Sequence, residues 1–486
     1  MKIGKIELTR REALKTGAAA AAVGATSTAI SGPALAGAEE DAVIAAAKKA
    51  VPGGADVTGI IWSNYQVALS GPVGEFGAAT GIDLKKIQDI STFEIPQRAM
   101  AEALSKSPEF DLFHVDSNMI PSLASAGLLE PIDEYLDNAG VKIKAVGNFG
   151  KFLTYKGKTY GVTTDGNVHV QFIRKDLFEN PDERKAFADK YGREMTWPET
   201  WEEELELMKF FTRPEDNLWG SANLRDRGSS VAWWYMYLYS AGGFPFTDDM
   251  EPNIDNDAGE YAVQTYLNVK EASHPEAAGW GTPQMIPRII NGNAFSCQYW
   301  DGIIALAENP SKSKTAGKWS YGPVPGSRHS GKLLKRSVST PNVAMLVNRH
   351  SPRKAAAAYL AAYLATADNS ARIVGDPVNT FHDPWHVDHF KAGSLPEKTY
   401  TPGGMAAIKQ NLEIVTPPIF LTGLLEFETE LKRNISEAYA GDKTAKAVVK
   451  DTTDAWARSI RRIGKRRLRE ELATYKSLFP SVDVPS

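Results

Sequence analysis

The stretch Phe110-Asp111-Leu112-Phe113-His114-Val115, followed by Asp116-Ser117 and a helix-like run over residues 119–126, decides the fold class. Its first part is a short apolar run rich in aromatic and β-branched residues, which is typical of a buried strand. The same order occurs upstream, with a strand predicted over residues 57–62 and a helix over 96–105. Strands that alternate with helices predict an α/β fold with mainly parallel sheets flanked by helices.

Polar residues follow both predicted strands. Tyr65 comes shortly after the first strand and Asp116 directly after the second. Ligands of open α/β sheets bind beyond the carboxyl ends of the strands, so both side chains are candidate ligand contacts. The alternative is that Asn64 or Asp116 caps the helix that follows.

Length and composition exclude several classes of protein. The chain has 486 residues, of which 43% are apolar and 23% charged, as in ordinary globular proteins and unlike disordered or fibrous ones. Its single cysteine cannot form an internal disulfide, and a net charge of -4 gives no electrostatic argument for nucleic-acid binding. The length predicts two or three domains, and no long linker separates them.

The first 36 residues are predicted to be a twin-arginine export signal. Arg10-Arg11 precede a weakly apolar run rich in Ala and Gly, and an A-x-A cleavage site ends at Ala36. The run is too short and too polar for a membrane anchor. No cysteine lies near the cleavage point, so we expect an unlipidated protein of the periplasm, and no later run of 18 apolar residues argues against solubility.

Catalytic and metal-binding signatures are weak. Phosphate-loop, zincin and nucleophile-elbow motifs are absent from the sequence, whereas a pair of catalytic carboxylates is defined by spacing in the fold. The segment from Phe381 to His389 holds His382, His386 and His389. Histidines can ligate zinc, but this spacing matches no common zinc site, so the alternative is a loop that touches a ligand.

Aromatic residues gather in three places: residues 233–239, residues 299–302 around Trp300 and Asp301, and residues 381–385. A helix with so many rings between Trp233 and Tyr239 cannot direct all of them at one core, so some should line a cleft or the surface. Aromatic faces beside carboxylates and amides suit a carbohydrate, which offers C–H faces and hydroxyl groups. Packing in the core is the alternative for each ring.

Several ordered motifs extend over most of the chain. They are SPEFDLF (107–113), GKTYGV (157–162), RKDLF (174–178), WPETWEE (197–203), NGNAF (291–295) leading to Trp300, and KWSYGPVPG (318–326). Together they resemble the family 1 extracellular solute-binding proteins of carbohydrate ABC importers, the maltose-binding-protein-like group. Within the fourth motif, Thr200 and Glu203 have the spacing of a helix capping box.

The resemblance implies a two-lobed periplasmic-binding-protein fold of type II with a ligand cleft between the lobes. The first lobe would comprise residues 37–163 and 325–374, and the second residues 164–324 and 375–486, with crossings near Thr163, Pro325 and Gly375. The family's usual proline is replaced by Thr163, and its usual Gly-Gly-Trp by residues 339–342. These departures lie at cleft positions, so they leave the identity of the solute open.

The function implied by the resemblance is capture of a sugar or polyol by hinge closure and delivery to a membrane permease, without a cofactor or catalysis, by a monomer. Tyr65 and Asp116 are expected from one lobe and the other contacts from the second lobe or close by: Asp165, Asn167, Trp234, Trp300, Asp301, Asn342 and His382. The alternatives are a periplasmic carbohydrate-active hydrolase or lyase, and a periplasmic metal-binding protein.

Overall fold

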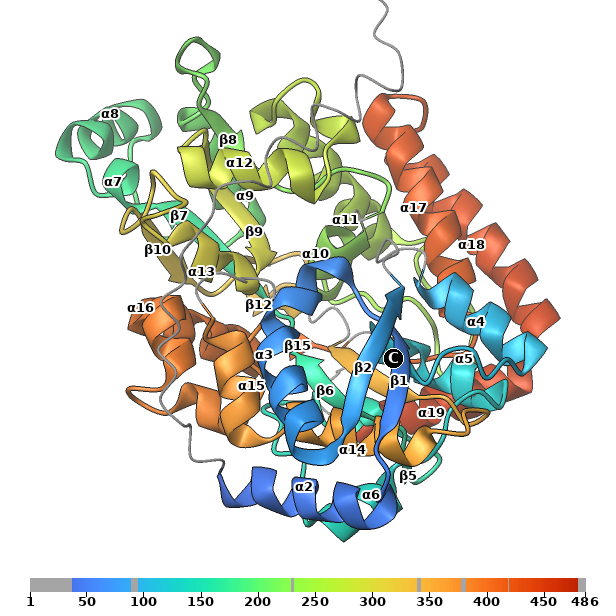
Figure 1. Ribbon diagram of the computed structural model, residues 1–486. Helices are drawn as coiled ribbons and strands as arrows, with labels where there is room; N and C mark the ends of the chain where they lie inside the picture. Colours follow the sequence, from blue (N-terminus) through green and yellow to red (C-terminus); the bar gives the residue numbers. More distant parts are fainter. Residues whose placement is uncertain are drawn as a thin grey trace, which may run out of the picture. The chain divides into compact units, whose positions relative to one another are not determined.

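The structure is a computed structural model that describes residues 37–88, 95–228, 231–338, 342–376, 382–417 and 419–479 (Figure 1). The predicted export signal over residues 1–36 lies outside the described residues. Residues Ala38–Ser486 form one unit, and the following description concerns that unit. No helix among the described residues has both the length and the apolar character that crossing a bilayer requires.

The first sheet has five strands in the order β2-β1-β3-β14-β6. Strand β1 pairs in parallel with β2 and with β3, whereas β14 pairs antiparallel with both β3 and β6. The bounds of these strands, in chain order, are β1 (Ala55–Ile60), β2 (Ile82–Gln88), β3 (Leu112–Asp116), β6 (Gly161–Asp165) and β14 (Val343–Val347).

The second sheet has four strands in the order β10-β7-β9-β8. Strand β7 pairs antiparallel with β10 and β9, and β8 pairs in parallel with β9. The bounds are β7 (His169–Arg174), β8 (Trp219–Ser221), β9 (Ala294–Trp300) and β10 (Trp319–Gly322).

Both sheets are flanked by helices, which confirms the α/β class, but each sheet is mixed where mainly parallel sheets were predicted. The reason lies in the path of the chain. Strand β14 enters the first sheet after the chain has passed through the second, so it runs against β3 and β6. A parallel neighbour would need a crossover over the same sheet.

Helices cover the first sheet on both sides. Helix α14 packs on β14 and contacts α2, α3 and α6, while α4 packs on β3. Their bounds are α2 (Ala38–Ala50), α3 (Ser63–Thr80), α4 (Ile95–Ser105), α5 (Ile120–Ser125), α6 (Asp133–Ala139), α14 (Lys354–Leu364) and α15 (Ala367–Val374). The predicted strands and helices of this region therefore exist, with ends that differ by one or two residues.

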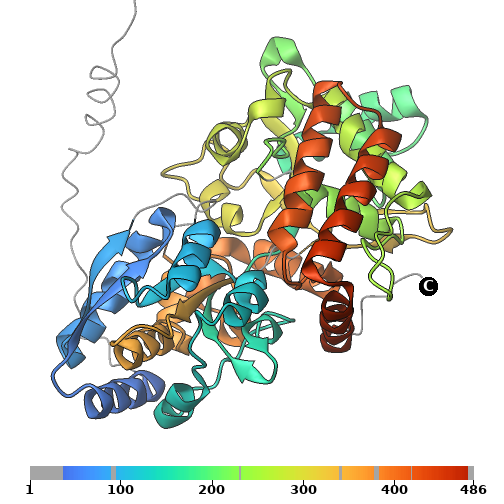
Figure 2. The ribbon, with the colours of Figure 1, turned by 90° about the vertical axis from the view of Figure 1, so that its right-hand side faces the viewer.

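Around the second sheet, α16 packs on β7 and β10, and α9 packs on β8. Helices α10 and α11 contact each other, and α17 and α18 lie side by side (Figure 2). Their bounds are α9 (Trp201–Phe210), α10 (Val231–Ser240), α11 (Asp257–Asn268), α16 (Leu395–Glu413), α17 (Leu424–Ala440), α18 (Ala445–Ile463) and α19 (Lys465–Leu478). The remaining α-helices here are short: α7 (Lys175–Phe178), α8 (Pro181–Tyr191), α12 (Thr282–Asn291) and α13 (Gly302–Ala307).

The boundaries of the two lobes stay predictions, and the strand pairs bear on where the chain crosses between the sheets. Asp165 still pairs within the first sheet and His169 already pairs within the second. Strand β13 (Ser337–Val338) lies against β7, and β14 belongs to the first sheet. This pairing favours crossings after Asp165 and after Val338, later than the predicted positions near Thr163 and Pro325.

Local sequence rules hold where neighbouring residues decide the structure. The Thr200 hydroxyl accepts from the backbone of Glu203, whose side chain accepts in return from the backbone of Thr200, so the predicted capping box is present. Helix α10 differs from the expectation that some of its aromatic side chains line a cleft or the surface. All of its residues are buried because α11, α17 and β13 surround it, so none of its aromatic side chains lies at the surface.

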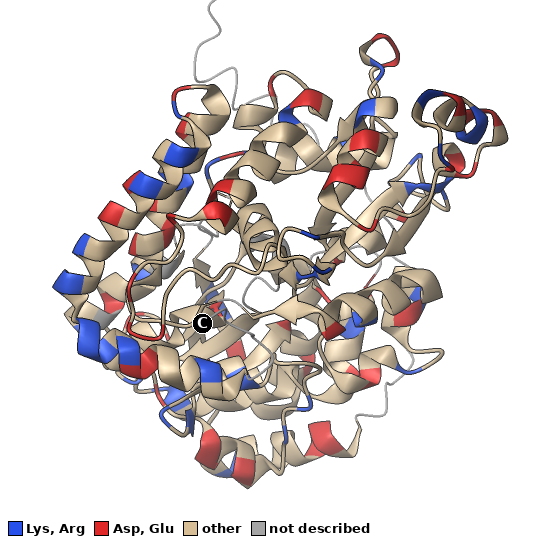
Figure 3. Cartoon of the chain, turned by 180° about the vertical axis from the view of Figure 1, so that it is seen from behind, with Lys and Arg blue, Asp and Glu red and all other residues tan. Residues whose placement is uncertain are grey.

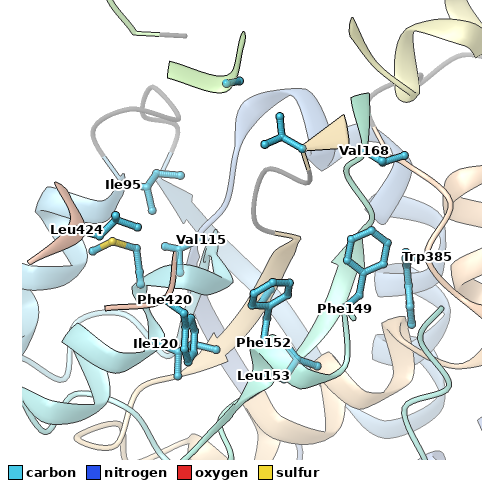
Figure 4. Close-up of a cluster of buried hydrophobic side chains, with 14 of the residues drawn as sticks. Ile95, Val115, Ile120, Phe149, Phe152, Leu153, Val168, Trp385, Phe420 and Leu424 are labelled. Carbon is cyan, nitrogen blue, oxygen red and sulfur yellow. The ribbon is translucent and has the colours of Figure 1, made fainter. Parts of the chain in front are cut away.

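The buried core joins residues that are far apart in the chain. Figure 4 shows Val115 of β3, Phe152, Phe420 and Leu424 among the buried side chains of one cluster. The ring of Phe152 lies 6.0 Å from that of Phe420 and 4.8 Å from that of Phe479. The C-terminal segment therefore packs on residues beside the first sheet.

Candidate functional site

The predicted residues of the first lobe lie at one edge of the first sheet. Strands β1, β3 and β6 run in the same direction, so Tyr65, Asp116 and Asp165 follow or end strands at the same edge. Asn342 immediately precedes the antiparallel β14 and lies at this edge for the same reason. Asp165 is the last residue of β6, so it belongs to the first sheet, although it was expected from the second lobe.

The second sheet contributes the end of β9. Trp300 is its last residue and Asp301 follows. Because β7 pairs antiparallel with β9, His169 at the start of β7 lies opposite Trp300. The ring of Trp300 packs at 4.8 Å from His169 and 5.7 Å from Trp233, and its side chain is partly exposed.

Tyr65, Asp165 and Asp383 join these edges by hydrogen bonds. The Tyr65 hydroxyl donates to Asp165 Oδ2 at 2.5 Å. The backbone N–H of Asp383 donates to the other oxygen of the same carboxyl group. In return, the N–H of Gly166 donates to the carbonyl oxygen of Asp383 at 3.0 Å. Helix α3, the end of β6 and the segment before α16 are thereby fixed to one another.

Asp301 adds a third carboxyl group to this cluster. Its Oδ1 accepts from the backbone N–H of Val168 at 3.0 Å, and its own N–H donates to Val168 O at 3.1 Å. Its side chain interacts with that of Asp383, and burial followed by this interaction holds the pKa of Asp383 well above its ordinary value. Burial also raises the pKa of Asp301, to about 8. Asp165 and Asp301 are both 0% exposed, so these carboxyl groups share a water-poor space.

Two buried histidines lie against Tyr65. The ring centroid of His382 is 4.1 Å from that of Tyr65, and that of His114 is 4.9 Å away. Burial lowers the pKa of His114 to about 3 and holds that of His382 well below its ordinary value. Both rings are therefore neutral near pH 7, and they bring no positive charge to the carboxyl groups.

Asp116 faces a different neighbour. It precedes a short 3-10 turn, but its side chain makes no capping hydrogen bond, so the capping alternative does not apply. Its enclosed position, followed by repulsion from Glu428, raises the pKa of Asp116 to about 7, with Lys432 acting in the opposite direction. Glu428 and Lys432 form an ion pair of 3.1 Å on α17, which is predicted to belong to the second lobe.

The other predicted contacts have different surroundings. The Asn342 amide accepts from Ser117 Oγ at 2.6 Å and donates to Thr163 Oγ1 at 2.7 Å, so it ties β3, β6 and β14 together. Trp234 is buried in α10 against Tyr235. Asn167 lies between β6 and β7 with a φ of 123°, a backbone conformation that Asn tolerates better than most residues.

The histidine-rich segment does not have the geometry of a metal site. His389 Nδ1 accepts from the backbone of Trp385 at 3.2 Å, and its Nε2 pairs with Ser370 Oγ at 3.0 Å. His386 Nδ1 accepts from the backbone of Asp388. Within the described part of the chain, no group of three or more His, Cys, Asp or Glu could hold a metal ion. These histidines stabilise a turn.

Several residues of the cluster escaped sequence reasoning. Asp383 stands beside His382 in the sequence, but it was assigned to a possible metal loop. His114 lies inside a strand pattern, and Glu428 lies on an ordinary amphipathic helix, where no local signal separates it from a surface residue. Only the tertiary structure brings them to the strand ends.

Unsatisfied polar atoms mark the centre of the cluster. Among the described residues, buried side-chain atoms without a hydrogen-bond partner include both ring nitrogens of His382, Asp301 Oδ2 and Asp383 Oδ1. Most buried polar atoms in folded proteins are paired, and an unpaired one costs about 1–3 kcal/mol. The arrangement can therefore gain hydrogen bonds from a small polar molecule placed among these groups.

Comparison with known proteins places this arrangement in a family. Residues 62–371 match the sequence profile of the family described as bacterial extracellular solute-binding protein. The chain therefore belongs to that family, as its motifs predicted. A probable amino-acid ABC transporter periplasmic-binding protein of Sinorhizobium fredii is 23% identical over 266 residues, which cover 52% of this chain and 57% of that relative.

Solved structures show the same fold. T. maritima MalE3 with bound maltose superposes with a TM-score of 0.70 at 17% identity, covering 83% of this chain and 99% of that one. A solute-binding protein of Agrobacterium vitis with bound D-mannitol gives 0.70 at 18% identity, covering 84% and 99%. A third, from Agrobacterium radiobacter with bound ribitol, gives 0.70 at 17% identity, covering 82% and 97%. The predicted two-lobed binding-protein fold is confirmed.

Proposed function

We propose that this protein is the substrate-binding component of an ABC importer, which captures a sugar or sugar-like polyol between its lobes and delivers it to a membrane permease. The observation that carries the proposal is the buried cluster of unsatisfied polar atoms where the ends of β1, β6 and β9 meet. Relatives with the same fold bind maltose, D-mannitol and ribitol, which supports the solute class.

The proposed site uses both lobes. Tyr65, Asp116 and Asp165 come from the first lobe, and Trp300 and Asp301 from the second. His382 lies in the segment that links them. Trp300 offers a partly exposed ring face for a sugar ring, while the carboxyl groups accept hydrogen bonds from hydroxyl groups. We include Asn167, Trp234 and Asn342 as residues that support the residues in contact with the solute.

Hinge closure follows from the burial of the site. Asp165, Asp301 and His382 are each 0% exposed, so a solute can reach them only when the lobes separate. Contacts made to both lobes at once favour the closed form, which is a shift between two populations of one protein. The segment between Asp165 and His169 would act as a hinge, and the lobes would divide there, between β13 and β14, and near Gly375.

Export and partners complete the proposal. The twin-arginine signal over residues 1–36 would direct an unlipidated monomer to the periplasm, where it meets the transmembrane subunits of the importer. No cofactor is needed because the family is one of binding proteins rather than enzymes.

A thermal-shift screen tests this function. The mature protein is heated with a panel of sugars and polyols, and a ligand at ~100 times its dissociation constant adds ~2.7 kcal/mol of stability. A shift with at least one member is expected. A shift only with solutes that are neither sugars nor polyols would overturn the solute class, although not the role in transport.

The hydrolase or lyase alternative has a separate test. Asp301 and Asp383 are adjacent carboxyl groups, as an acid–base pair would require. Incubation of the protein with the glycosides that raise its melting temperature should release no product. Stoichiometric binding without turnover is the expected result, and sustained release of reducing sugar would replace the transport function with catalysis.

A further inference from the structure

Three carboxyl groups meet in a buried space, and no positively charged side chain pairs with them among the described residues. The carboxyl of Asp165 is bound by the N–H of Asp383, and the side chains of Asp383 and Asp301 interact directly. All three are at most 3% exposed. Burial therefore holds the pKa values of Asp301 and Asp383 above their ordinary range, so both groups keep a proton at neutral pH, and a cation placed beside them would allow them to ionise.

The protein itself provides no such cation in the part of the chain that the structure describes. None of the ion pairs there involves Asp165, Asp301 or Asp383. The groups that act most on their pKa values are other carboxyls, the Tyr65 hydroxyl and backbone N–H groups. The nearby ring of His382 is neutral because of its burial.

A second and independent observation points to a ligand at this place. Both ring nitrogens of His382 are buried without a hydrogen-bond partner, and the ring packs edge-on against Tyr65, whose hydroxyl binds Asp165. Asp301 Oδ2 and Asp383 Oδ1 likewise receive no hydrogen bond from an N–H group, and the two carboxyl groups interact only with each other on that side. The cluster therefore offers a pair of carboxyl groups and an imidazole whose hydrogen-bonding capacity is not used by N–H donors of the protein.

Aromatic rings border the carboxyl groups. Trp300 immediately precedes Asp301, and its ring stands against Trp233 and His169. On the other side, Trp62 packs on Tyr65 at 5.0 Å. The faces of Trp and Tyr rings attract ammonium groups, and carboxylates form their strongest hydrogen bonds with charged donors.

We propose that the solute carries a protonated amine, so that the substrate class is an amino sugar or amino polyol rather than a neutral one. This inference rests on the proposed function and narrows it. The ammonium group would lie against the Asp301–Asp383 pair, because two of its three N–H donors match the carboxyl oxygens that lack such a donor and one is left for a further acceptor. The hydroxyl groups would then reach Tyr65, Asp165 and His382.

The test uses matched ligand pairs on the native mature protein. Glucosamine is compared with glucose and with N-acetylglucosamine, and 1-amino-1-deoxysorbitol with sorbitol; putrescine represents an amine that is not a carbohydrate. Calorimetry should give at least tenfold tighter binding for an aminated member than for its neutral counterpart. N-acetylation, which removes the charge and keeps the size, should abolish that gain.

Variants locate the effect. Asp383→Asn should remove the preference for the amine, so that the ratio of the affinities for the aminated and the neutral member falls at least tenfold. Asp388→Asn is the matched control, since Asp388 lies in the same segment but forms a surface ion pair with Lys391. Asp301→Asn serves as the second variant if Asp383→Asn does not fold.

The outcomes separate this inference from the proposed function. If neutral members bind as tightly as aminated ones, the amine is wrong and the sugar-binding function stands. If putrescine alone binds, the carbohydrate class is wrong and the ammonium site stands. If the whole panel fails to bind, both are overturned.

Discussion

Trp300 differs from Trp233 and Trp234 in keeping part of its side chain exposed, at the end of β9. Trp233 and Trp234 are 0% exposed, so they serve packing, whereas Trp300 is partly exposed and directly precedes Asp301. This difference within one group of aromatic residues cannot be seen in the sequence, where all three look alike.

We predict that Trp300→Ala lowers the affinity for the best ligand at least tenfold, because a stacked ring is among the largest contacts that a sugar site offers. Calorimetry measures the loss. The control is Trp280→Ala, since Trp280 is half-buried too but lies under Arg288, 4.1 Å from its guanidinium. Equal losses in both variants would show that the effect is structural.

At the scale of elements, α9 is held to the second sheet by one buried carboxyl group. Glu204 Oε1 accepts from Gln171 Nε2 of β7 at 2.8 Å and from Ser296 Oγ of β9 at 2.9 Å. Burial raises the pKa of Glu204 to about 7, in spite of these hydrogen bonds. The folded protein thus keeps a proton that the unfolded chain releases above its ordinary carboxyl pKa.

The sign of the resulting pH dependence follows. This contribution to stability is present at acid pH and is lost as the pH rises from about 4.5 towards 7. We predict that Glu204→Gln, which cannot ionise, gains up to about 3 kcal/mol relative to the native protein between pH 5 and 8. Urea unfolding at pH 5 and at pH 8 measures the free energy of unfolding of each protein. Glu202→Gln, on the exposed side of α9, should show the same change with pH as the native protein. The same change with pH for Glu204→Gln would contradict the prediction.

Helices α18 and α19 show how one residue ends an element. The basic residues between Arg458 and Arg469 suggest one amphipathic helix, but Gly464 breaks it with a φ of 112° and a ψ of 104°. Lys and Arg residues occur along both helices (Figure 3). Lys465 pairs with Glu251 and Arg462 with Glu426, so part of this basic run is paired within the chain.

We predict that Gly464→Ala lowers the free energy of unfolding by about 1–3 kcal/mol, because residues with a Cβ rarely adopt this backbone conformation. Gly74→Ala, inside α3 and with open space around its Cβ position, should instead raise it by about 0.5–1 kcal/mol. Chemical denaturation distinguishes the two signs. If the Gly464→Ala protein is as stable as the native one, packing rather than the backbone conformation of Gly464 causes the break between α18 and α19.

At the scale of the whole molecule, α19 and the residue after it contact segments that are far apart in the sequence. Lys151 donates to Leu478 O at 2.8 Å, and Phe479 packs on Phe152. Lys476 pairs with Asp248. The C-terminal helix therefore holds these segments together by contacts that lie outside the acidic cluster.

We predict that saturation with the best ligand reduces the radius of gyration measured by small-angle X-ray scattering. The reason is that the described form encloses the site, so the ligand should favour it over a more open one. A ligand that binds one lobe only is not expected to change the radius. Tight binding at constant radius would contradict closure as the mechanism.

The sequence by itself determined the class of the fold, the family and the local signals. The order of strand-like and helix-like runs, the capping box at Thr200 and the spaced motifs depend on neighbouring residues, and they hold in the structure. It also indicated Tyr65, Asp165, Asp301 and His382, which the structure brings into contact with one another. Residues after strands can be predicted because strand ends align along one edge of a sheet.

Only the tertiary structure decided the direction of β14, the burial of all of α10 and the meeting of Asp301 with Asp383. Each depends on how distant segments pack: the return of the chain from the second sheet, the helices around α10, and a turn held by His386 and His389. Local preferences carry no information about such contacts, because the free energy that selects them comes from burial against segments that are distant in the sequence.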